Sequence, residues 1–198
     1  MEPVIHHIVP GDFVVTQWSG GATRQIAIGP QGAVYADRDF LWRISSATVE
    51  LPESDFTPLP DYQRLISVLE GEMQISHGNG PCMDLQPFQI HEFDGGVDTH
   101  SWGTCTDYNL MLRKGRCTGS LSSLHLHGGE SAALPRAVQG EGTCELVLYC
   151  AVGDGVITEG ETKMAFGSGE GVYIRAPNSP VLHSSRDASI MVAEIHCT

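Results

Sequence analysis

Short runs of apolar residues, interrupted by glycine and proline, follow one another along the whole chain. No stretch keeps the 3.6-residue apolar period of an amphipathic helix beyond a couple of turns, and 23 Gly and 11 Pro punctuate the runs. Many short strands separated by turn residues are typical of all-β barrels and sandwiches. The runs predict strands at residues 24–28, 41–49, 65–69, 108–112, 121–126, 146–152, 156–157, 171–174 and 190–195.

Two of these predicted strands carry charged or amide side chains among large apolar ones. Alternate residues of a strand point to opposite faces, so Arg43 shares a face with Ser45, and Asp107 shares a face with Asn109 and Met111. Such polar groups destabilise an apolar core unless they face a polar cavity or pair with one another. The pattern therefore favours a barrel with a polar, functional interior over a purely apolar core.

The two halves of the chain show a similar design. The run at 65–69 leads into an acidic, glycine-containing turn at 70–72, and the run at 148–152 leads into another at 153–155. Identity between the halves is weak, so the duplication rests on this repeated pattern. We expect two cupin-like antiparallel barrels packed together, a first at residues 1–116 and a second, degenerate one at residues 117–198, with strands that the halves can exchange.

Composition and charge narrow the classes of function. Eleven Lys and Arg against 24 Asp and Glu give a formal net charge of −13, and the basic residues form no cluster. This predicts no nucleic-acid partner and no anionic membrane surface as partner. The start of the chain has no basic region followed by an apolar run, and the six cysteines are scattered without a Cys-x-x-Cys pair. We therefore expect a cytoplasmic protein whose cysteines are all reduced.

The strand at 65–69 and its Leu-Glu-Gly-Glu turn resemble the signature of cupins, small antiparallel barrels. Cupins usually hold a metal with a His-x-His pair and a Glu. Laid on this chain, that pattern puts Thr57 and Leu59 at the histidine positions and Arg64 at the Glu position. An arginine cannot ligate a metal because its guanidinium stays protonated. The resemblance thus implies a barrel whose metal is replaced by a cation, with neither a metal nor another cofactor.

More specific motifs lie in order within the first hundred or so residues. They are Trp18-Ser19-Gly20-Gly21-Ala22-Thr23-Arg24, Phe40-Leu41-Trp42-Arg43-Ile44-Ser45, Phe56-Thr57-Pro58-Leu59-Pro60 with Arg64, and Asp107-Tyr108-Asn109-Leu110-Met111. Together they resemble the HutD/Ves family, encoded in bacterial histidine-utilisation operons. The chain departs from the family where Gly-x-Asp-Arg becomes Asp61-Tyr62-Gln63-Arg64 and where Gln25 replaces a commoner Glu. The resemblance implies a two-cupin fold that regulates histidine breakdown by sensing an intermediate.

The candidate ligand-binding residues share a position in these motifs and a hydrogen-bonding side chain. They are Arg64, Arg43, Asp107, Asn109, Thr23 and Arg24. An arginine grips a carboxylate through two parallel hydrogen bonds, and Asp107 or Asn109 offers an acceptor for an imidazole N–H. The alternatives are a structural salt bridge between an arginine and Asp107, and a surface turn that leaves Arg24 exposed.

The sequence His125-Leu126-His127, followed by Glu130, is a second candidate for metal binding because it places two imidazoles on one strand face. Its position is unfavourable, since the cupin pattern of the second half needs histidines near Gln139 and Glu141. We therefore predict no metal site, and since the sequence contains no Gly-x-Ser-x-Gly elbow and no recognisable cysteine motif, we also predict no catalytic residue.

Three functions follow from these features. The leading hypothesis is a non-catalytic sensor that binds a small carboxylate, such as urocanate or formiminoglutamate, in the first barrel. The second is a cupin enzyme, an isomerase or a hydrolase, that uses the Arg/Asp group or the histidines at 125 and 127. The third is a protein-interaction module with a vestigial pocket. A homodimer is left open, and the sequence names neither the ligand nor a regulated target.

Overall fold

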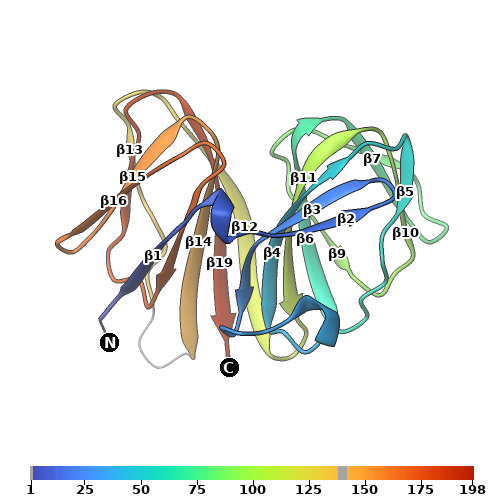
Figure 1. The fold of residues 1–198 in the computed structure, drawn as a ribbon, viewed down its shortest axis with the longest axis horizontal. Coiled ribbons are helices and arrows are strands. Elements are labelled where there is room, and N and C mark those ends of the chain that lie inside the picture. Colours follow the sequence, from blue (N-terminus) through green and yellow to red (C-terminus); the bar gives the residue numbers. More distant parts are fainter. Residues whose placement is uncertain (1, 138–141) are drawn as a thin grey trace. The chain divides into compact units, whose positions relative to one another are not determined.

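The computed structural model describes residues 2–137 and 142–198, and these are almost entirely strands and turns (Figure 1). Each run predicted as a strand lies within an observed strand, except that Leu41 precedes the strand it was assigned to. The all-β prediction is confirmed. Within the described ranges there is no helix with the length and apolar character needed to span a membrane.

The segment Phe13–Arg116 forms one compact unit, called here the first unit. Its six-stranded sheet holds, in order, β2 (Val14–Trp18), β3 (Gly21–Gly29), β4 (Trp42–Val49), β11 (Cys105–Arg113), β6 (Tyr62–Gly71) and β9 (His91–Asp94). Its four-stranded sheet holds β5 (Glu53–Asp55), β10 (Thr99–Trp102), β7 (Met73–His77) and β8 (Met83–Leu85), and the 3-10 turn η2 (Tyr35–Asp37) precedes β4. Buried residues of both sheets, among them Ile66, Val68 and Ile75, form a shared apolar core.

The second unit combines the N-terminal segment through Asp12 with Cys117–Thr198. Its five-stranded sheet runs β1 (Val4–Ile8), β17 (Gly171–Arg175), β14 (Thr143–Val152), β19 (Ala188–Cys197) and β12 (Cys117–Leu126). Its four-stranded sheet runs β13 (Ser131–Ala133), β18 (Val181–His183), β15 (Asp154–Glu159) and β16 (Thr162–Gly167), and η1 (Pro10–Asp12) follows β1. Leu146, Leu148, Ile157 and Leu182 lie in the core between these sheets.

The two units repeat one strand plan. The orders β4-β11-β6-β9 and β5-β10-β7-β8 of the first unit recur as β12-β19-β14-β17 and β13-β18-β15-β16 in the second. The two glycine turns recognised in the sequence occupy matching places, at the end of β6 and just after β14, where Gly71 and Gly153 have φ angles of 85° and 91°. A side chain at either position would be strained. This correspondence supports an internal duplication.

The N-terminal strand departs from the expected division of the chain. The expected division places residues 1–116 in the first barrel and 117–198 in the second, and the units do change between Arg116 and Cys117. However, β1 pairs antiparallel with β17, with Val4 opposite Arg175 and Ile8 opposite Gly171. The first strand therefore belongs to the second unit, where it covers an edge of β17 that would otherwise expose unpaired backbone groups. Nothing in the local sequence distinguishes β1 from a strand of the first unit.

The expectation that all cysteines are reduced is wrong for one pair. Cys117 and Cys197 form a disulfide across β12 and β19, where they are directly opposite in the strand register. Their separation of 80 residues in the chain hides this pairing from sequence spacing. Cys82, Cys105 and Cys150 are free, as is Cys144.

Candidate functional site

A cavity of about 360 Å³ lies in the first unit against the six-stranded sheet. Strands β2, β3, β4, β5, β6 and β11 contribute to its wall, together with the segment around η2 and the residues that follow β5. The polar side chains that line it include Thr23, Arg43, Ser45, Arg64, Asp107 and Asn109. Five of the six candidate residues therefore meet in one cavity.

The strand register explains why these side chains converge. In the pairing of β11 with β4, Asn109 is opposite Ser45 and Met111 is opposite Arg43; in its pairing with β6, Met111 is opposite Arg64. Residues directly opposite one another in a sheet project from the same face. The alternation read from the sequence thus becomes one continuous polar wall across three strands.

Arg43 is held by neighbours on its own face. Its Nε donates to Gln25 Oε1 at 2.9 Å and its Nη1 donates to Ser45 Oγ at 3.2 Å. Its guanidinium carbon lies 4.0 Å from the centroid of the Tyr35 ring, and that of Arg38 lies 3.9 Å from the same centroid. Burial lowers the pKa of Arg43. Arg43 is therefore a fixed part of the cavity wall, and Tyr35 is flanked by two cations.

Arg64 has fewer partners. Only 6% of it is exposed, and its guanidinium carbon lies 4.8 Å and 5.2 Å from the ring centroids of Phe56 and Phe93. Its Nε has no hydrogen-bond partner among the described residues, and no carboxylate in those ranges forms an ion pair with it. Burial lowers the pKa of Arg64 to about 10, so the side chain is still charged at pH 7. A buried cation that has no direct ion pair with a carboxylate favours the binding of an anion.

Asp107 and Asn109 supply acceptors on the neighbouring strand. Asp107 Oδ1 accepts the backbone N–H of Ala47 at 2.9 Å, and burial raises the pKa of Asp107 to about 6 despite the attraction of Arg64 and Arg43. Asn109 is 3% exposed, and its Oδ1 has no hydrogen-bond partner among the described residues. The cavity wall therefore presents a weakly acidic carboxyl and an unused amide oxygen beside two cations.

Arg24 is the candidate that the structure separates from the others. It is exposed, does not line the cavity, and its Nη1 donates to Thr48 Oγ1 at 3.3 Å. Neighbouring residues of a strand face opposite ways, so Thr23 and Arg24 cannot both point into one cavity. Gln25, whose side chain holds Arg43, is the residue that the alternation should have indicated.

Tyr35 and Arg38 are among the cavity residues that sequence reasoning missed. They come from η2 and the residue after it, a segment without strand periodicity, and Arg38 has a left-handed φ of 57°. The segment is fastened by Tyr62, whose Oη lies 3.0 Å and 2.9 Å from the carbonyl oxygens of Arg38 and Phe40. The aromatic residue on a short turn was the available signal, but its distance from Arg43 depends on the folded chain.

The positions that cupins use for metal ligands have other roles here. Thr57 lines the cavity, and Leu59 packs in an apolar cluster with Phe40 and Met111. His125 Nδ1 lies 3.0 Å from Ser189 Oγ.

The other residues of the second metal candidate are at the surface. His127 is exposed near Asp187, and Glu130 Oε2 accepts the backbone N–H of His127. Within the described residues His125, His127 and Glu130 do not form a metal-binding group. Gln139 and Glu141 lie outside the described residues.

The second unit carries apolar residues where the first has its polar wall. Each unit has a bulge where the strand equivalent to β6 meets the strand equivalent to β11, at Thr106/Asp107 and at Cys150/Val152. Counting from these bulges, Leu146 occupies the place of Arg64, and Ile190 and Val192 occupy the places of Asp107 and Asn109. All three belong to the apolar core of the second unit. The described part of the second unit therefore lacks the polar wall that lines the cavity of the first.

Comparison with known proteins places the chain in a family. The family model described as HutD matches residues 11–192. A conserved protein of unknown function from Pseudomonas aeruginosa PAO1 is structurally similar, with a TM-score of 0.82 and 21% identity over 97% of this chain and 98% of that one. HutD from Pseudomonas fluorescens SBW25 is similar at a TM-score of 0.75 and 18% identity, over 98% of this chain and 100% of that one.

The bacterial pirin YhhW from Escherichia coli, solved in complex with nickel(II), has a TM-score of 0.75 and 10% identity over 98% of this chain and 100% of that one. At these identities the structural neighbours establish the cupin-like fold alone. No curated protein sequence matches the chain significantly. Because the family model covers most of its length, the chain belongs to the HutD family.

Proposed function

We propose that this HutD-family protein is a non-catalytic sensor in histidine utilisation that binds a small carboxylate in the cavity of its first unit. The observation that carries the proposal is Arg64, a buried guanidinium that faces a cavity and has no carboxylate partner among the described residues. A ligand carboxylate would meet its planar fork through two parallel, charge-assisted hydrogen bonds. The cavity of about 360 Å³ lies at the lower end of the size range of small-molecule sites.

The rest of the wall favours a ligand that also carries an N–H group. Asn109 Oδ1 and the carboxyl of Asp107 are acceptors, and the Tyr35 ring, over which the guanidinium groups of Arg38 and Arg43 lie, also lines the cavity. Urocanate combines a carboxylate, a planar conjugated system and an imidazole N–H, and formiminoglutamate combines carboxylates with a formimino N–H. Both therefore complement the charges and hydrogen-bonding groups of the wall.

An enzyme is the second candidate, and one observation favours it. Asp107 has a pKa raised to about 6 in a cavity that also holds two cations, which is the kind of carboxyl that acts as a general acid or base near neutral pH. An isomerase or a hydrolase of a small polar metabolite would use such a group. The two candidates differ in whether the bound compound is converted.

A ligand screen with a turnover measurement decides between them. Thermal unfolding of the full chain is recorded with urocanate, formiminoglutamate, histidine and glutamate, and each compound is then followed by NMR in the presence of the protein. A sensor shows a concentration-dependent rise in Tm with one compound and no conversion of it. Conversion that is lost in Asp107→Asn would establish the enzyme instead. No rise in Tm with any carboxylate, together with no conversion, would reject both.

A further inference from the structure

The apolar face of the second unit's large sheet ends in three polar side chains. Along β19, Ile190 and Val192 face the core, and the alternation continues through Glu194 and His196 on the same face. On β14, Leu146 and Leu148 face the core, so Cys144, two residues before Leu146, projects from that same face. A thiol, a carboxylate and an imidazole therefore share one face at one end of the sheet.

The geometry of this group is that of a chelating site. Cys144 is directly opposite His196 in the register, and Glu194 precedes His196 by two residues on the same strand. One donor atom from each side chain lies within 4.8 Å of those of the other two, and His196 Nε2 is 2.8 Å from Glu194 Oε1. With the usual zinc–ligand bond lengths, donors at the corners of a tetrahedron are separated by about 3.4–3.8 Å. Small side-chain rotations would bring the three donors to these separations.

The donor set selects the class of cation. Sulfur and imidazole nitrogen favour zinc and neighbouring transition metals, whereas calcium and magnesium prefer oxygen ligands. We propose that Cys144, Glu194 and His196 form a binding site for a zinc-class divalent cation, separate from the cavity of the first unit. The side chains of His196 and Glu194 are 32% and 26% exposed, so solvent has access to the fourth coordination position.

The backbone around the group is held in place before any metal binds. Strand β19 is paired on both sides, by β14 and by β12. The Cys117–Cys197 disulfide links the last residue of β19, which follows His196, to the first residue of β12. Ligands on rigid strands lose little conformational freedom on binding. The cupin positions and the histidines at 125 and 127, on which the sequence-based expectation of no metal rested, are not part of this group.

A nucleophilic cysteine is the competing interpretation of a Cys-His-Glu group. Burial, with Glu194 and Glu145 nearby, raises the pKa of the Cys144 thiol to about 11. Reactive cysteines have lowered pKa values, because the thiolate is the nucleophile. Metal binding rests instead on geometry, since one donor atom from each of the three side chains lies within 4.8 Å of the other two.

Metal titration of the intact, disulfide-bonded chain tests the proposal. The protein is treated with chelator, exchanged into metal-free buffer without thiol reductants, and titrated with Zn²⁺ and with Co²⁺. The expected result is about one Zn²⁺ per chain by elemental analysis and a thiolate-to-Co²⁺ charge-transfer absorption with tetrahedral d–d bands. Cys144→Ser should abolish the charge-transfer absorption. His196→Ala should weaken Zn²⁺ binding more than about a hundredfold, because even an outer-shell partner contributes roughly 10- to 100-fold.

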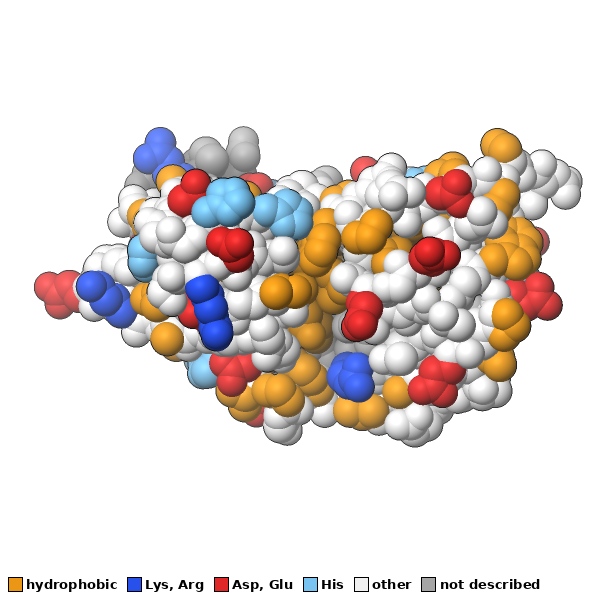
Figure 2. Space-filling model, turned by 90° about the horizontal axis from the view of Figure 1, so that it is seen from above, with side chains coloured by type: hydrophobic (Ala, Val, Ile, Leu, Met, Phe, Trp, Pro, Cys, Tyr) orange, Lys and Arg blue, Asp and Glu red, His pale blue; other side chains and the backbone are white. Residues whose placement is uncertain are grey.

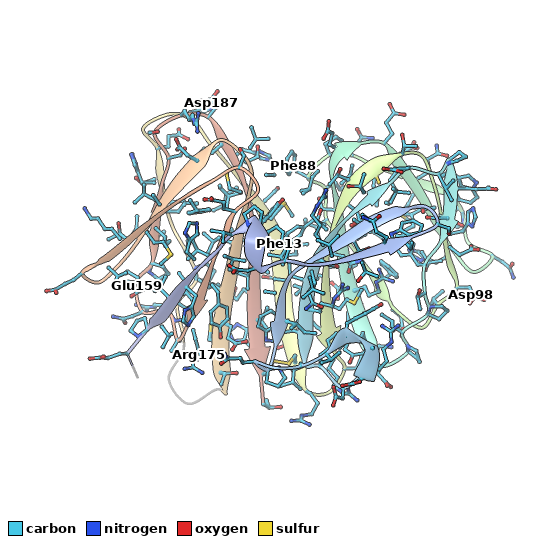
Figure 3. All side chains as sticks on the ribbon, in the orientation of Figure 1. Phe13, Phe88, Asp98, Glu159, Arg175 and Asp187 are labelled. Atoms are coloured by element: carbon cyan, nitrogen blue, oxygen red, sulfur yellow. A yellow bond between two sulfur atoms is a disulfide. The ribbon has the colours of Figure 1, made fainter. Side chains whose placement is uncertain are left out.

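Two matched controls use other residues of the same types. Cys82→Ser removes an exposed free thiol, and His127→Ala removes an exposed histidine beside Asp187. Figure 3 shows Asp187, which is near His127, at one end of the second unit and Arg175 at the other. Arg175 is opposite Glu145, which directly follows Cys144 in the chain, so His127 lies far from the proposed site. Both control variants should bind Zn²⁺ like the wild type.

Several results would overturn the proposal. They are a wild-type protein without stoichiometric Zn²⁺, a charge-transfer absorption that persists in Cys144→Ser, and Zn²⁺ binding that is lost only in a control variant. Circular dichroism in chelator shows whether each variant folds. If Cys144→Ser or His196→Ala does not fold, the wild-type titrations and the isosteric Glu194→Gln variant still decide.

Discussion

Replacing Arg64 with leucine separates a ligand-binding role from a structural one. The pKa of Arg64 falls from 12.5 to about 10, and at about 1.36 kcal/mol per pKa unit the buried charge costs the folded state on the order of 3 kcal/mol. Contacts with the Phe56 and Phe93 rings offset about 1–2 kcal/mol of this. In the ligand-free protein we therefore expect the free energy of unfolding of Arg64→Leu to lie within about 2 kcal/mol of the wild-type value, as measured by urea denaturation.

Ligand affinity should respond much more strongly than stability. A hydrogen bond between ionised groups contributes about 1.5–3 kcal/mol, and about 1.4 kcal/mol corresponds to a factor of ten in Kd. Calorimetry with the best compound of the screen should show roughly ten- to a hundredfold weaker binding for Arg64→Leu. Arg64→Lys should restore only part of the affinity, because a single ammonium cannot reproduce the planar fork.

Two outcomes would refute this reasoning. Equal affinities of wild type, Arg64→Leu and Arg64→Lys would mean that the ligand carboxylate is bound elsewhere. A loss of more than about 3 kcal/mol of stability in ligand-free Arg64→Leu would identify Arg64 as one half of a structural ion pair, because a lone buried partner is strongly destabilising. Arg24→Leu, which changes an exposed arginine outside the cavity, is the matched control and should leave both quantities unchanged.

Three further predictions concern Asp107 in the cavity wall, the segment around η2 and the disulfide. Asp107 has a pKa of about 6 in the folded protein and an ordinary value of 3.8, so the unfolded chain loses this proton first as the pH rises. The free energy of unfolding should therefore fall by up to about 3 kcal/mol between about pH 4 and about pH 6. Asp107→Asn should remove that part of the slope in urea titrations at the two pH values, and an unchanged slope would contradict the raised pKa. Tyr62→Phe removes the hydrogen bond to the Phe40 carbonyl and should lower the unfolding free energy by about 1–2 kcal/mol, seen as a lower Tm; an unaltered Tm would mean that water replaces the bond. Finally, Cys197→Ser should lower the unfolding free energy by about 4 kcal/mol, because Cys117 then no longer closes a loop of 80 residues, and thiol titration of the denatured, unreduced wild type should leave this one pair unreactive.

The surface agrees with the charge balance read from the sequence. Figure 2 shows Asp and Glu side chains scattered over one face, with few Lys and Arg among them and no basic patch on that face. The net charge of −13 is thus spread rather than concentrated there. This distribution agrees with the expectation that no nucleic acid is a partner, which remains a prediction.

The sequence by itself determined the strands and the inward-facing polar residues. Side-chain alternation is a local property of an extended backbone, so Arg43 with Ser45 and Asp107 with Asn109 could be assigned to shared faces before any pairing was known. The glycine turns after β6 and β14 were equally local, because a left-handed backbone position favours glycine wherever it occurs. The family resemblance lay in these same segments, and the family match confirms it.

Only the tertiary structure decided which of these faces meet. Strand register and pairing join residues that are far apart in the chain. They place the side chain of Gln25 against Arg43 and leave Arg24 outside the cavity. They also pair β1 with a strand of the second unit and place Cys117 opposite Cys197. The loop that supplies Tyr35 has no periodicity, so its contact with the arginines depends on how it packs. A pattern in the sequence describes one strand at a time. A cavity or a cross-link depends on the free energy of assembling several strands, so it cannot be predicted from any single segment.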